Sequence, residues 1–271
     1  MTQMNDVRTI VREKYGSIAE GRSCGCGCGC AVDQPEASGP VARETVLEKI
    51  GYSHEQTAAI PGESNLGLGC GNPLAHAGLH AGETVLDLGS GAGIDCFLAA
   101  REVGPHGRVI GVDMTAAMID RARAARAQGG YATVEFRLGE IEHLPVADAS
   151  VDLVISNCVV NLSPEKDQVF REALRVLRPG GRMVVSDLVW LRPMPETVRA
   201  SVDALIGCVA GATLKDEYLE LMRRAGFTSV EVVEESRYAV GLEGLAKDDD
   251  QRRAFDDVRS IKVRALKAAQ V

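Results

Sequence analysis

The sequence predicts an α/β fold, in which a mostly parallel sheet follows a Cys-rich N-terminal segment and precedes a smaller α+β C-terminal domain. From Glu83 to Asp187, short apolar runs alternate with helix-length runs, a rhythm typical of βαβ units. The turn Gly89–Gly93 joins the first apolar run to the first helix of this series. We therefore divide the chain into a helical and loop segment (1–75), a parallel-sheet domain (76–190) and a C-terminal α+β domain (191–271).

The N-terminal segment is expected to contain two helices separated by a loop. Apolar residues fall on one face of a helix over residues 5–15. Residues 16–39 are rich in Gly, Cys and Ser and predict a loop, after which residues 41–50 can form a second short helix. Residues 62–73 are full of turn residues and predict another loop, close to the start of the sheet.

The middle of the chain supplies the predicted parallel strands and their crossover helices. Strands are identified by short apolar or alternating runs, and helices by amphipathic or Ala-rich runs. The turn Pro179-Gly180-Gly181 ends the last of these helices. The expected strands cover residues 84–88, 108–112, 134–138, 151–156 and 183–187, and the expected helices cover 94–102, 116–127 and 165–177.

The C-terminal part has a less regular rhythm. Two helices are expected over residues 195–206 and 214–225, the second ended by Gly226. Residues 230–233 are strand-like, and residues 241–256 are charged and expected to be exposed. The alternation of Ile261, Val263 and Ala265 with charged residues predicts a final, half-buried strand.

Composition excludes several classes of function. The chain has 271 residues, 45% of them hydrophobic, and a formal net charge of −8. An acidic chain without a basic stripe is a poor candidate for nucleic-acid or anionic-membrane binding. No apolar run reaches the roughly 18 residues that a membrane-spanning helix needs, and no signal-peptide core is present at the N-terminus. We therefore expect a cytoplasmic protein, in which cysteines serve metal binding, redox work or catalysis.

A glycine-rich turn with two flanking acids predicts a cofactor site. Glycines at this position let the backbone turn sharply and approach a ligand. The next predicted strand ends at Asp113, whose carboxylate can accept both hydroxyls of an adenosine ribose. The dinucleotide pattern G-x-G-x-x-G/A fails because Ile94 stands at its last position, and Asp87 suits a cationic ligand better than a pyrophosphate. A purely structural turn is the simpler alternative.

With these residues the chain resembles the class I S-adenosylmethionine-dependent methyltransferases, over roughly residues 80–190. The resemblance implies a Rossmann-like sheet that binds S-adenosylmethionine. It also implies that the glycine turn wraps the methionine part, that Asp113 holds the ribose, that Met114 packs on the adenine and that Asn157 lies by the sulfonium. The cofactor residues implied in this way are Asp87, Gly89, Ser90, Gly91, Gly93, Asp113, Met114, Ile141, Glu142 and Asn157.

Three isolated cysteines narrow the resemblance. Cys158 follows a predicted central strand, where open α/β sheets bind ligands, whereas Cys70 and Cys208 lie in small-residue loops far away in the sequence. Their spacing matches no local zinc motif, and a buried structural thiol is the common alternative for any one of them. The segments LGCGNP, DLGSGAGIDC, GVDMT, GEIEHLPV, SNCVVNLSPEK and GCVAGA, taken together, resemble the arsenite methyltransferases over roughly residues 60–230.

This resemblance implies that Cys70, Cys158 and Cys208 bind trivalent arsenic and are the catalytic residues. Soft ions select thiolate ligands, and three thiolates suit a pyramidal arsenic atom that keeps its lone pair. That lone pair can attack the sulfonium methyl carbon directly, so the protein mainly supplies proximity and orientation. The substrate would be arsenite or thiol-bound arsenic, and the products methylated arsenicals in a detoxification reaction. A protein disulfide formed in turnover would be reduced by a thioredoxin-type or small-thiol reductant.

Other cysteines and histidines are weaker candidates. The run Cys24, Cys26, Cys28 and Cys30 is either a flexible soft-metal trap or a glycine-cysteine loop with an auxiliary role, and one of its thiols could pair with Cys70. Cys96 is expected to be a core thiol. His76 and His80 could share a helix face as metal ligands, but Gly78 lies between them and no third ligand is evident.

Two other functions fit parts of the sequence. A non-catalytic arsenic or soft-metal binding protein would bind arsenite without methyl transfer and would not need Asp113. A carbon methyltransferase acting on a quinone or sterol would need a long apolar pocket and would be indifferent to Cys158→Ser. The sequence leaves open the number of methyl groups added, the acceptance of antimony or bismuth, and the oligomeric state.

Overall fold

The computed structural model describes residues 2–21, 46–199, 204–205, 208–238 and 249–270. Ten of the predicted elements lie where the sequence places them, with ends that differ by a few residues. The helices are α1 (Thr2–Ala19), α3 (His54–Ala58), α4 (Ile94–Val103), α5 (Ala116–Gly129), α6 (Lys166–Val176), α7 (Glu196–Arg199), α9 (Lys215–Ala225) and α11 (Asp249–Ala254). The strands are β1 (Thr84–Leu88), β2 (Arg108–Asp113), β3 (Val134–Leu138), β4 (Val151–Asn157), β5 (Leu177–Trp190), β6 (Ser229–Arg237) and β7 (Val258–Leu266).

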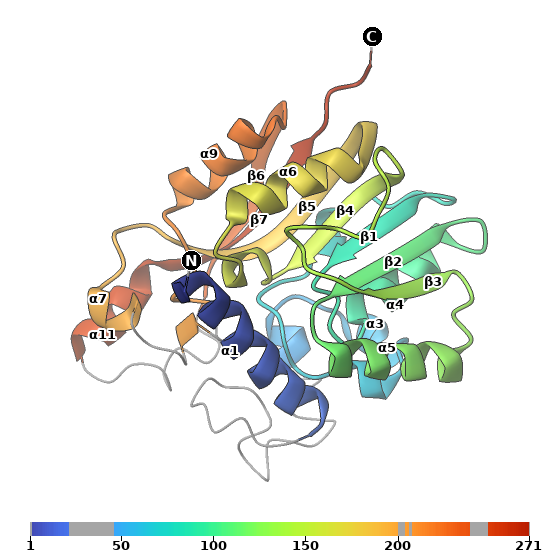
Figure 1. Ribbon diagram of the computed structural model, residues 1–271, viewed down its shortest axis with the longest axis horizontal. Helices are drawn as coiled ribbons and strands as arrows, with labels where there is room; N and C mark the ends of the chain where they lie inside the picture. The colour runs from blue at the N-terminus through green and yellow to red at the C-terminus, as the bar shows by residue number, and fades with distance from the viewer. Residues whose placement is uncertain (1, 22–45, 200–203, 206–207, 239–248, 271) are drawn as a thin grey trace.

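The strands form one seven-stranded sheet in the order β3-β2-β1-β4-β5-β7-β6 (Figure 1). Strands β1 to β5 are parallel, and β7 runs antiparallel to both of its neighbours. Chain order reverses direction across the sheet at β1, which lies between β2 and β4. Such a switch point opens a crevice at the carboxyl ends of the strands, where sheets of this kind bind ligands.

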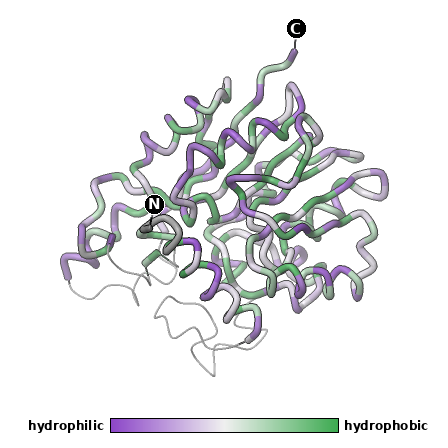
Figure 2. The backbone as a smooth tube through the Cα atoms, in the orientation of Figure 1, coloured by the Kyte–Doolittle hydropathy of each residue, from purple (hydrophilic) through white to green (hydrophobic). Residues whose placement is uncertain are grey.

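Helices cover both faces of the sheet. On one face, α6 and α9 bury Phe170 and Tyr218 against β1, β4 and β5. On the other face, α4 and α5 bury Phe97 and Ile119 against the same central strands. Hydrophobic residues run along the central strands, and hydrophilic residues recur on the helices and outer loops (Figure 2). This two-sided burial explains why the central strands are near-continuous apolar runs in the sequence.

Three boundaries differ from the sequence prediction. Helix α1 continues to Ala19, into the stretch expected to be loop. Strand β5 begins at Leu177, because Leu177 already pairs with Val151, and it passes through the Pro179-Gly180-Gly181 turn with a register shift. Strand β7 is mostly buried, not half-buried, because it lies between β5 and β6 inside the sheet. The strands of segment 191–271 thus extend the central sheet.

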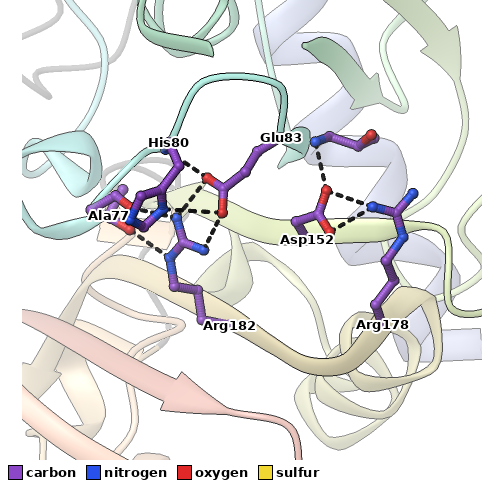
Figure 3. Close-up of polar contacts among 8 residues, drawn as sticks. Ala77, His80, Glu83, Asp152, Arg178 and Arg182 are labelled. Carbon is purple, nitrogen blue, oxygen red and sulfur yellow. Dashed lines mark hydrogen bonds and ion pairs between the residues drawn. The ribbon is translucent and has the colours of Figure 1, made fainter. Parts of the chain in front are cut away.

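Ion pairs tie the amino ends of the central strands to the segment before β1. Arg182 of β5 donates to both carboxylate oxygens of Glu83 and to the carbonyl of Ala77 (Figure 3). Beside this pair, Arg178 donates to both carboxylate oxygens of Asp152. These contacts stabilise the amino ends of the strands, opposite the carboxyl ends where the crevice lies. Within the described part of the chain, no helix is long and apolar enough to span a membrane.

Candidate functional site

A pocket lies at the carboxyl ends of β1, β2 and β4, at the switch point of the sheet. Strand residues, the glycine turn and helix α1 all contribute to its wall. Nine of the ten residues predicted to hold the cofactor line it, together with Cys158 and Cys208. These nine are Asp87, Gly89, Ser90, Gly91, Asp113, Met114, Ile141, Glu142 and Asn157.

The glycine turn has a conformation that other residues adopt poorly. Gly89, Gly91 and Gly93 all have positive φ angles, of 66°, 51° and 98°. A Cβ atom on Gly89 would lie 2.3 Å from a methyl carbon of Val159. Gly93 was predicted to line the pocket but does not. It is the N-cap of α4 and packs against Phe136 and Phe97. Its role is to bring the start of α4 close to the sheet.

Acidic side chains surround the turn. The carboxylate of Asp113 accepts the backbone N–H groups of Gly91 at 2.9 Å and Thr115 at 2.8 Å. Burial raises the pKa of Asp113 and, together with the neighbouring Asp95 carboxylate, raises the pKa of Asp87 well above its usual range. Burial also raises the pKa of Asp95, to about 6. A cationic ligand would favour the ionised form of these groups, which an anionic ligand would oppose.

Helix α1 reaches the far side of the pocket through one arginine. Arg8 donates to Glu142 at 3.1 Å and also pairs with Glu165. The Glu142 carboxylate is buried and also accepts the hydroxyl of Ser163, at 2.5 Å. Arg8 thereby fixes α1 against Glu142, one of the cofactor residues that the resemblance implies.

The three predicted arsenic ligands meet beside this pocket. The Sγ atoms of Cys70 and Cys158 lie within 4.8 Å of each other and of an Asp187 carboxylate oxygen. The Sγ atom of Cys208 donates to the carbonyl oxygen of Cys158 at 2.8 Å. All three cysteines are free and buried. Three thiols from distant parts of the sequence therefore belong to one buried apolar cluster, which also contains Leu188, Trp190 and Val209.

Local geometry aims two of these thiols. Cys158 and Cys208 have positive φ angles, of 60° and 62°, which is rare for residues with a side chain. Trp190 donates its indole N–H to the carbonyl of Val209 at 3.0 Å, which holds the segment of Cys208 against β5. A Cβ atom on Gly211 would lie 2.0 Å from the carbonyl oxygen of Asn161, so only glycine allows this approach.

Burial keeps the thiols of Cys70 and Cys158 protonated. It raises the pKa of Cys70 to about 11, and it raises the pKa of Cys158 well above its usual range. Asp187 lies behind the thiols, and its burial raises its pKa to about 7 even though the Leu188 N–H and Tyr218 hydroxyl groups donate to it. The site therefore favours a partner that takes the thiol protons away with it.

Other candidates from the sequence are not part of this site. Cys96 is a core thiol, as expected, and donates to Asp87 at 3.3 Å. His76 and His80 do not share a metal, because they pair separately with Glu234 and Glu83. Cys24, Cys26, Cys28 and Cys30, and the first half (41–45) of the predicted 41–50 helix, lie outside the described residues, whereas residues 46–49 are helical.

Among the pocket-lining residues that sequence reasoning missed are Arg8, Tyr15, Tyr52 and Asp95. Asp95 could have been found, because an acid in the first turn of the helix after a glycine loop must face the same ligand. Arg8, Tyr15 and Tyr52 carry no such signal, since only the fold brings them to the switch point. The positive φ angles of Cys158 and Cys208 also have no signature in the sequence.

The strand order, the antiparallel β7, the glycine turn and the acid after β2 define the class I S-adenosylmethionine-dependent methyltransferase fold. Residues 79–226 match the family described as "Methyltransferase domain", and the chain belongs to that family.

Two similar relatives are both named arsenite methyltransferase. The chain is 52% identical over 236 residues to the arsenite methyltransferase of Halobacterium salinarum, an alignment that covers 84% of this chain and 59% of that protein. It is 39% identical over 152 residues to human arsenite methyltransferase, covering 53% of this chain and 40% of the human protein. This chain thus spans only part of the length of these relatives.

A solved structure is similar over most of the chain. The crystal structure of CrArsM, an arsenic (III) S-adenosylmethionine methyltransferase from Chlamydomonas reinhardtii, aligns with a TM-score of 0.65 and 37% identity. The alignment covers 82% of this chain and 74% of that chain.

Proposed function

We propose that this protein is an S-adenosylmethionine-dependent arsenite methyltransferase. The observation that carries the proposal is the meeting of Cys70, Cys158 and Cys208 beside the cofactor pocket. The three proposed segments each supply one thiol: residues 1–75 supply Cys70, 76–190 supply Cys158 and 191–271 supply Cys208. The names of the relatives support arsenic as the substrate.

The pocket fits the proposed cofactor. Buried carboxylates suit its ammonium and sulfonium charges, and the ribose hydroxyls suit Asp113. Within the described residues, the hydroxyl of Ser90 is one of four buried side-chain polar atoms without a hydrogen-bond partner, and Ser90 is one of the residues that line this pocket. S-adenosylmethionine, when bound, supplies an electrophilic methyl group on its sulfonium. The residues that would hold it are those that line the pocket from Asp87 to Asn157.

Arsenic loading suits protonated thiols. Neutral arsenous acid exchanges its three hydroxyl groups for three cysteine sulfurs, and each thiol proton leaves with a hydroxyl group as water. No net charge is left in the buried site, which matches the raised pKa of Cys70 and Cys158. The chain then holds a pyramidal arsenic atom, and the side on which its lone pair points is set by the three cysteines. Orientation toward the methyl carbon is the main catalytic contribution, since no proton must be removed from arsenic.

The location and the reductant follow from the need for free thiols. A cytoplasmic location would keep the thiols reduced, whereas oxidising compartments favour disulfides. If turnover produces a protein disulfide, a thioredoxin-type or small-thiol reductant would restore the ligands by exchange.

The proposal is tested by incubating the protein with arsenite, S-adenosylmethionine and a thiol reductant, then separating methylated arsenicals. We expect product from the wild type and from Cys96→Ser, a buried thiol outside the site, and a loss of at least about a hundredfold in Cys158→Ser and Cys208→Ser. Equal activity in all variants would refute the three-thiol site. Arsenite binding without any product in the wild type would favour a non-catalytic arsenic-binding protein.

A further inference from the structure

Asn157 lies where the thiol site and the cofactor pocket meet. It is the last residue of β4, directly before Cys158, but its side chain contacts the loop that carries Cys70. Its Oδ1 accepts the backbone N–H of Cys70 at 3.1 Å, and its Nδ2 donates to the carbonyl of Gly71 at 2.7 Å. The amide therefore pairs with the chain on both sides of Cys70, as a neighbouring strand would.

The loop of Cys70 is packed too tightly to shift freely. A Cβ atom on Gly69 would lie 3.0 Å from Nδ2 of Asn157, and one on Gly71 would lie 2.0 Å from the hydroxyl of Ser186. From β7, the hydroxyl of Ser260 donates to the carbonyl of Cys70 at 2.8 Å. These contacts fix the backbone of Cys70 relative to the ends of β4, β5 and β7.

The amide nitrogen of Asn157 also contacts residues of the cofactor pocket. Nδ2 of Asn157 donates to the Tyr52 hydroxyl at 2.8 Å, and that hydroxyl donates to the Asp95 carboxylate at 2.8 Å. The second Asp95 oxygen lies 3.4 Å from Nδ2. Since an ionised carboxylate only accepts hydrogen bonds, it requires the NH₂ end of the amide on its side. The oxygen end is then left for the N–H of Cys70.

We propose that Asn157 is a positioning residue that sets Cys70 against Cys158, and that Tyr52 and Asp95 couple this arrangement to the cofactor pocket. This inference rests on the proposed function, because it assigns the residue that joins the thiol site for arsenic to the pocket for S-adenosylmethionine. A cationic ligand next to Asp95 stabilises the hydrogen bonds of Tyr52 and Asn157, and so stabilises the position of Cys70 before arsenic arrives. Coupling of this kind is reciprocal, so arsenic also tightens cofactor binding.

Two variants test the proposal in the full chain. Titration with arsenite, in the absence and in the presence of saturating sinefungin, gives the arsenite Kd of the protein without and with a bound cofactor analogue. Sinefungin is a cofactor analogue that keeps a positive charge and transfers no methyl group. We expect sinefungin to lower the arsenite Kd at least about fivefold in the wild type and to leave it unchanged in Tyr52→Phe. Asn157→Ala is expected to weaken arsenite binding roughly tenfold without changing the Tm by more than a few degrees.

Matched controls separate positioning from general destabilisation. Tyr131→Phe removes a hydroxyl that donates to the carbonyl of Ala59, far from the thiols, and should keep the full coupling. Asn72→Ala removes another loop amide, which caps residues 73–76, and should lower the Tm while leaving the arsenite Kd unchanged. A wild type without coupling, or Tyr52→Phe with full coupling, would overturn the link to the cofactor pocket.

A readout that needs no arsenic keeps this proposal separate from the proposed function. The rate of Cys70 alkylation by iodoacetamide, followed by peptide mass spectrometry, is expected to rise about tenfold in Asn157→Ala, with Cys96 unchanged as the internal reference. An unchanged Cys70 rate would overturn the positioning role. A wild type that fails to bind arsenite would refute the proposed function, and the alkylation rates would still decide the role of Asn157.

Discussion

Cys158 and Cys208 occupy left-handed backbone positions that favour glycine. Each such position costs about 1–3 kcal/mol, and such costs persist at sites where the surrounding structure fixes the backbone. Cys158 is fixed by its N–H bond to the carbonyl of Ser186 at 2.8 Å, and Cys208 by its N–H bond to Leu205 at 2.9 Å. The left-handed conformation turns both side chains out of the regular path of the chain and into one apolar cluster with Cys70.

Asp187, behind the thiols, gives the folded protein a defined pH dependence. Burial raises its pKa to about 7, so the folded state keeps a proton that the unfolded state loses near pH 4. Its contribution to stability is therefore fully present below about pH 4, and it is lost as the pH rises to about 7. Relative to Asp187→Asn, the wild type should lose on the order of a few kcal/mol of unfolding free energy across this window.

Urea unfolding of both proteins between about pH 5 and pH 8 measures this difference. Asp152→Asn, which removes a partly buried carboxylate paired with Arg178 but keeps Asp187, is the control and should show the same pH slope as the wild type. A free-energy difference between wild type and Asp187→Asn that is constant with pH would contradict the assignment of a raised pKa to Asp187.

At the scale of elements, the start of α4 depends on Gly93. Its φ angle is 98°, and an added Cβ would lie 2.7 Å from the Phe136 ring. Gly82 has a similar φ of 86° but open space around the same position. We expect Gly82→Ala to cost about 1–2 kcal/mol from backbone strain alone, and Gly93→Ala to cost about 1–3 kcal/mol more from overpacking.

Chemical denaturation gives both costs, and cofactor titration gives the functional effect. Gly93→Ala should also weaken S-adenosylmethionine binding, since the displaced α4 carries Asp95 into the pocket wall, whereas Gly82→Ala should not. Equal stability losses in the two variants would show that close packing of α4 on the sheet is not what requires glycine at position 93.

Helix α1 is held over the pocket by one partly buried arginine and one exposed arginine. Arg8 pairs with the buried Glu142, whereas Arg12 pairs with Glu140 at the surface. Arg8→Ala leaves a buried carboxylate without its partner and should cost about 1–3 kcal/mol and weaken cofactor binding several-fold. Arg12→Ala should cost less than about 0.5 kcal/mol and leave cofactor binding unchanged. Calorimetric titration of the cofactor checks both, and equal affinities would contradict a role for α1 in the pocket.

Element types in the βα region could be predicted because each strand and helix carries its own periodicity. The predictions fail where pairing partners decide the outcome. Leu177 joins β5 because Val151 is available beside it, and Lys262 of β7 is buried because Glu234 of β6 neutralises it. Neither partner can be identified from the local sequence.

In the whole molecule, the candidate site also contains some residues that local sequence patterns predict and others that only the complete fold brings together. The glycine turn and Asp113 are close in sequence and follow from local patterns, and the three cysteines were assigned through resemblance. Tyr52, Arg8 and Asp187 were not singled out as site residues, because only the complete sheet with α1 and the Cys70 loop in place brings them together. The contact between Ser260 and Cys70, 190 residues apart, is the extreme case.

The sheet order explains how one chain brings two chemically different ligands together. The switch point at β1 and β4 supplies the polar cofactor pocket, and the ends of β4, β5 and β7 supply the apolar wall with the thiols. Asn157 and Cys158, adjacent at the end of β4, stand at the boundary of the two. We therefore propose that the fold presents three sulfurs to one arsenic atom next to the cofactor.

X-ray absorption at the arsenic edge of the arsenite-loaded protein is the direct test of this three-sulfur coordination. We expect three sulfur neighbours and no oxygen neighbour of arsenic in the wild type and in Cys96→Ser. We expect two sulfurs with one oxygen in Cys70→Ser, Cys158→Ser and Cys208→Ser. Oxygen-dominated coordination in the wild type, or three sulfurs retained in any of these last three variants, would contradict it.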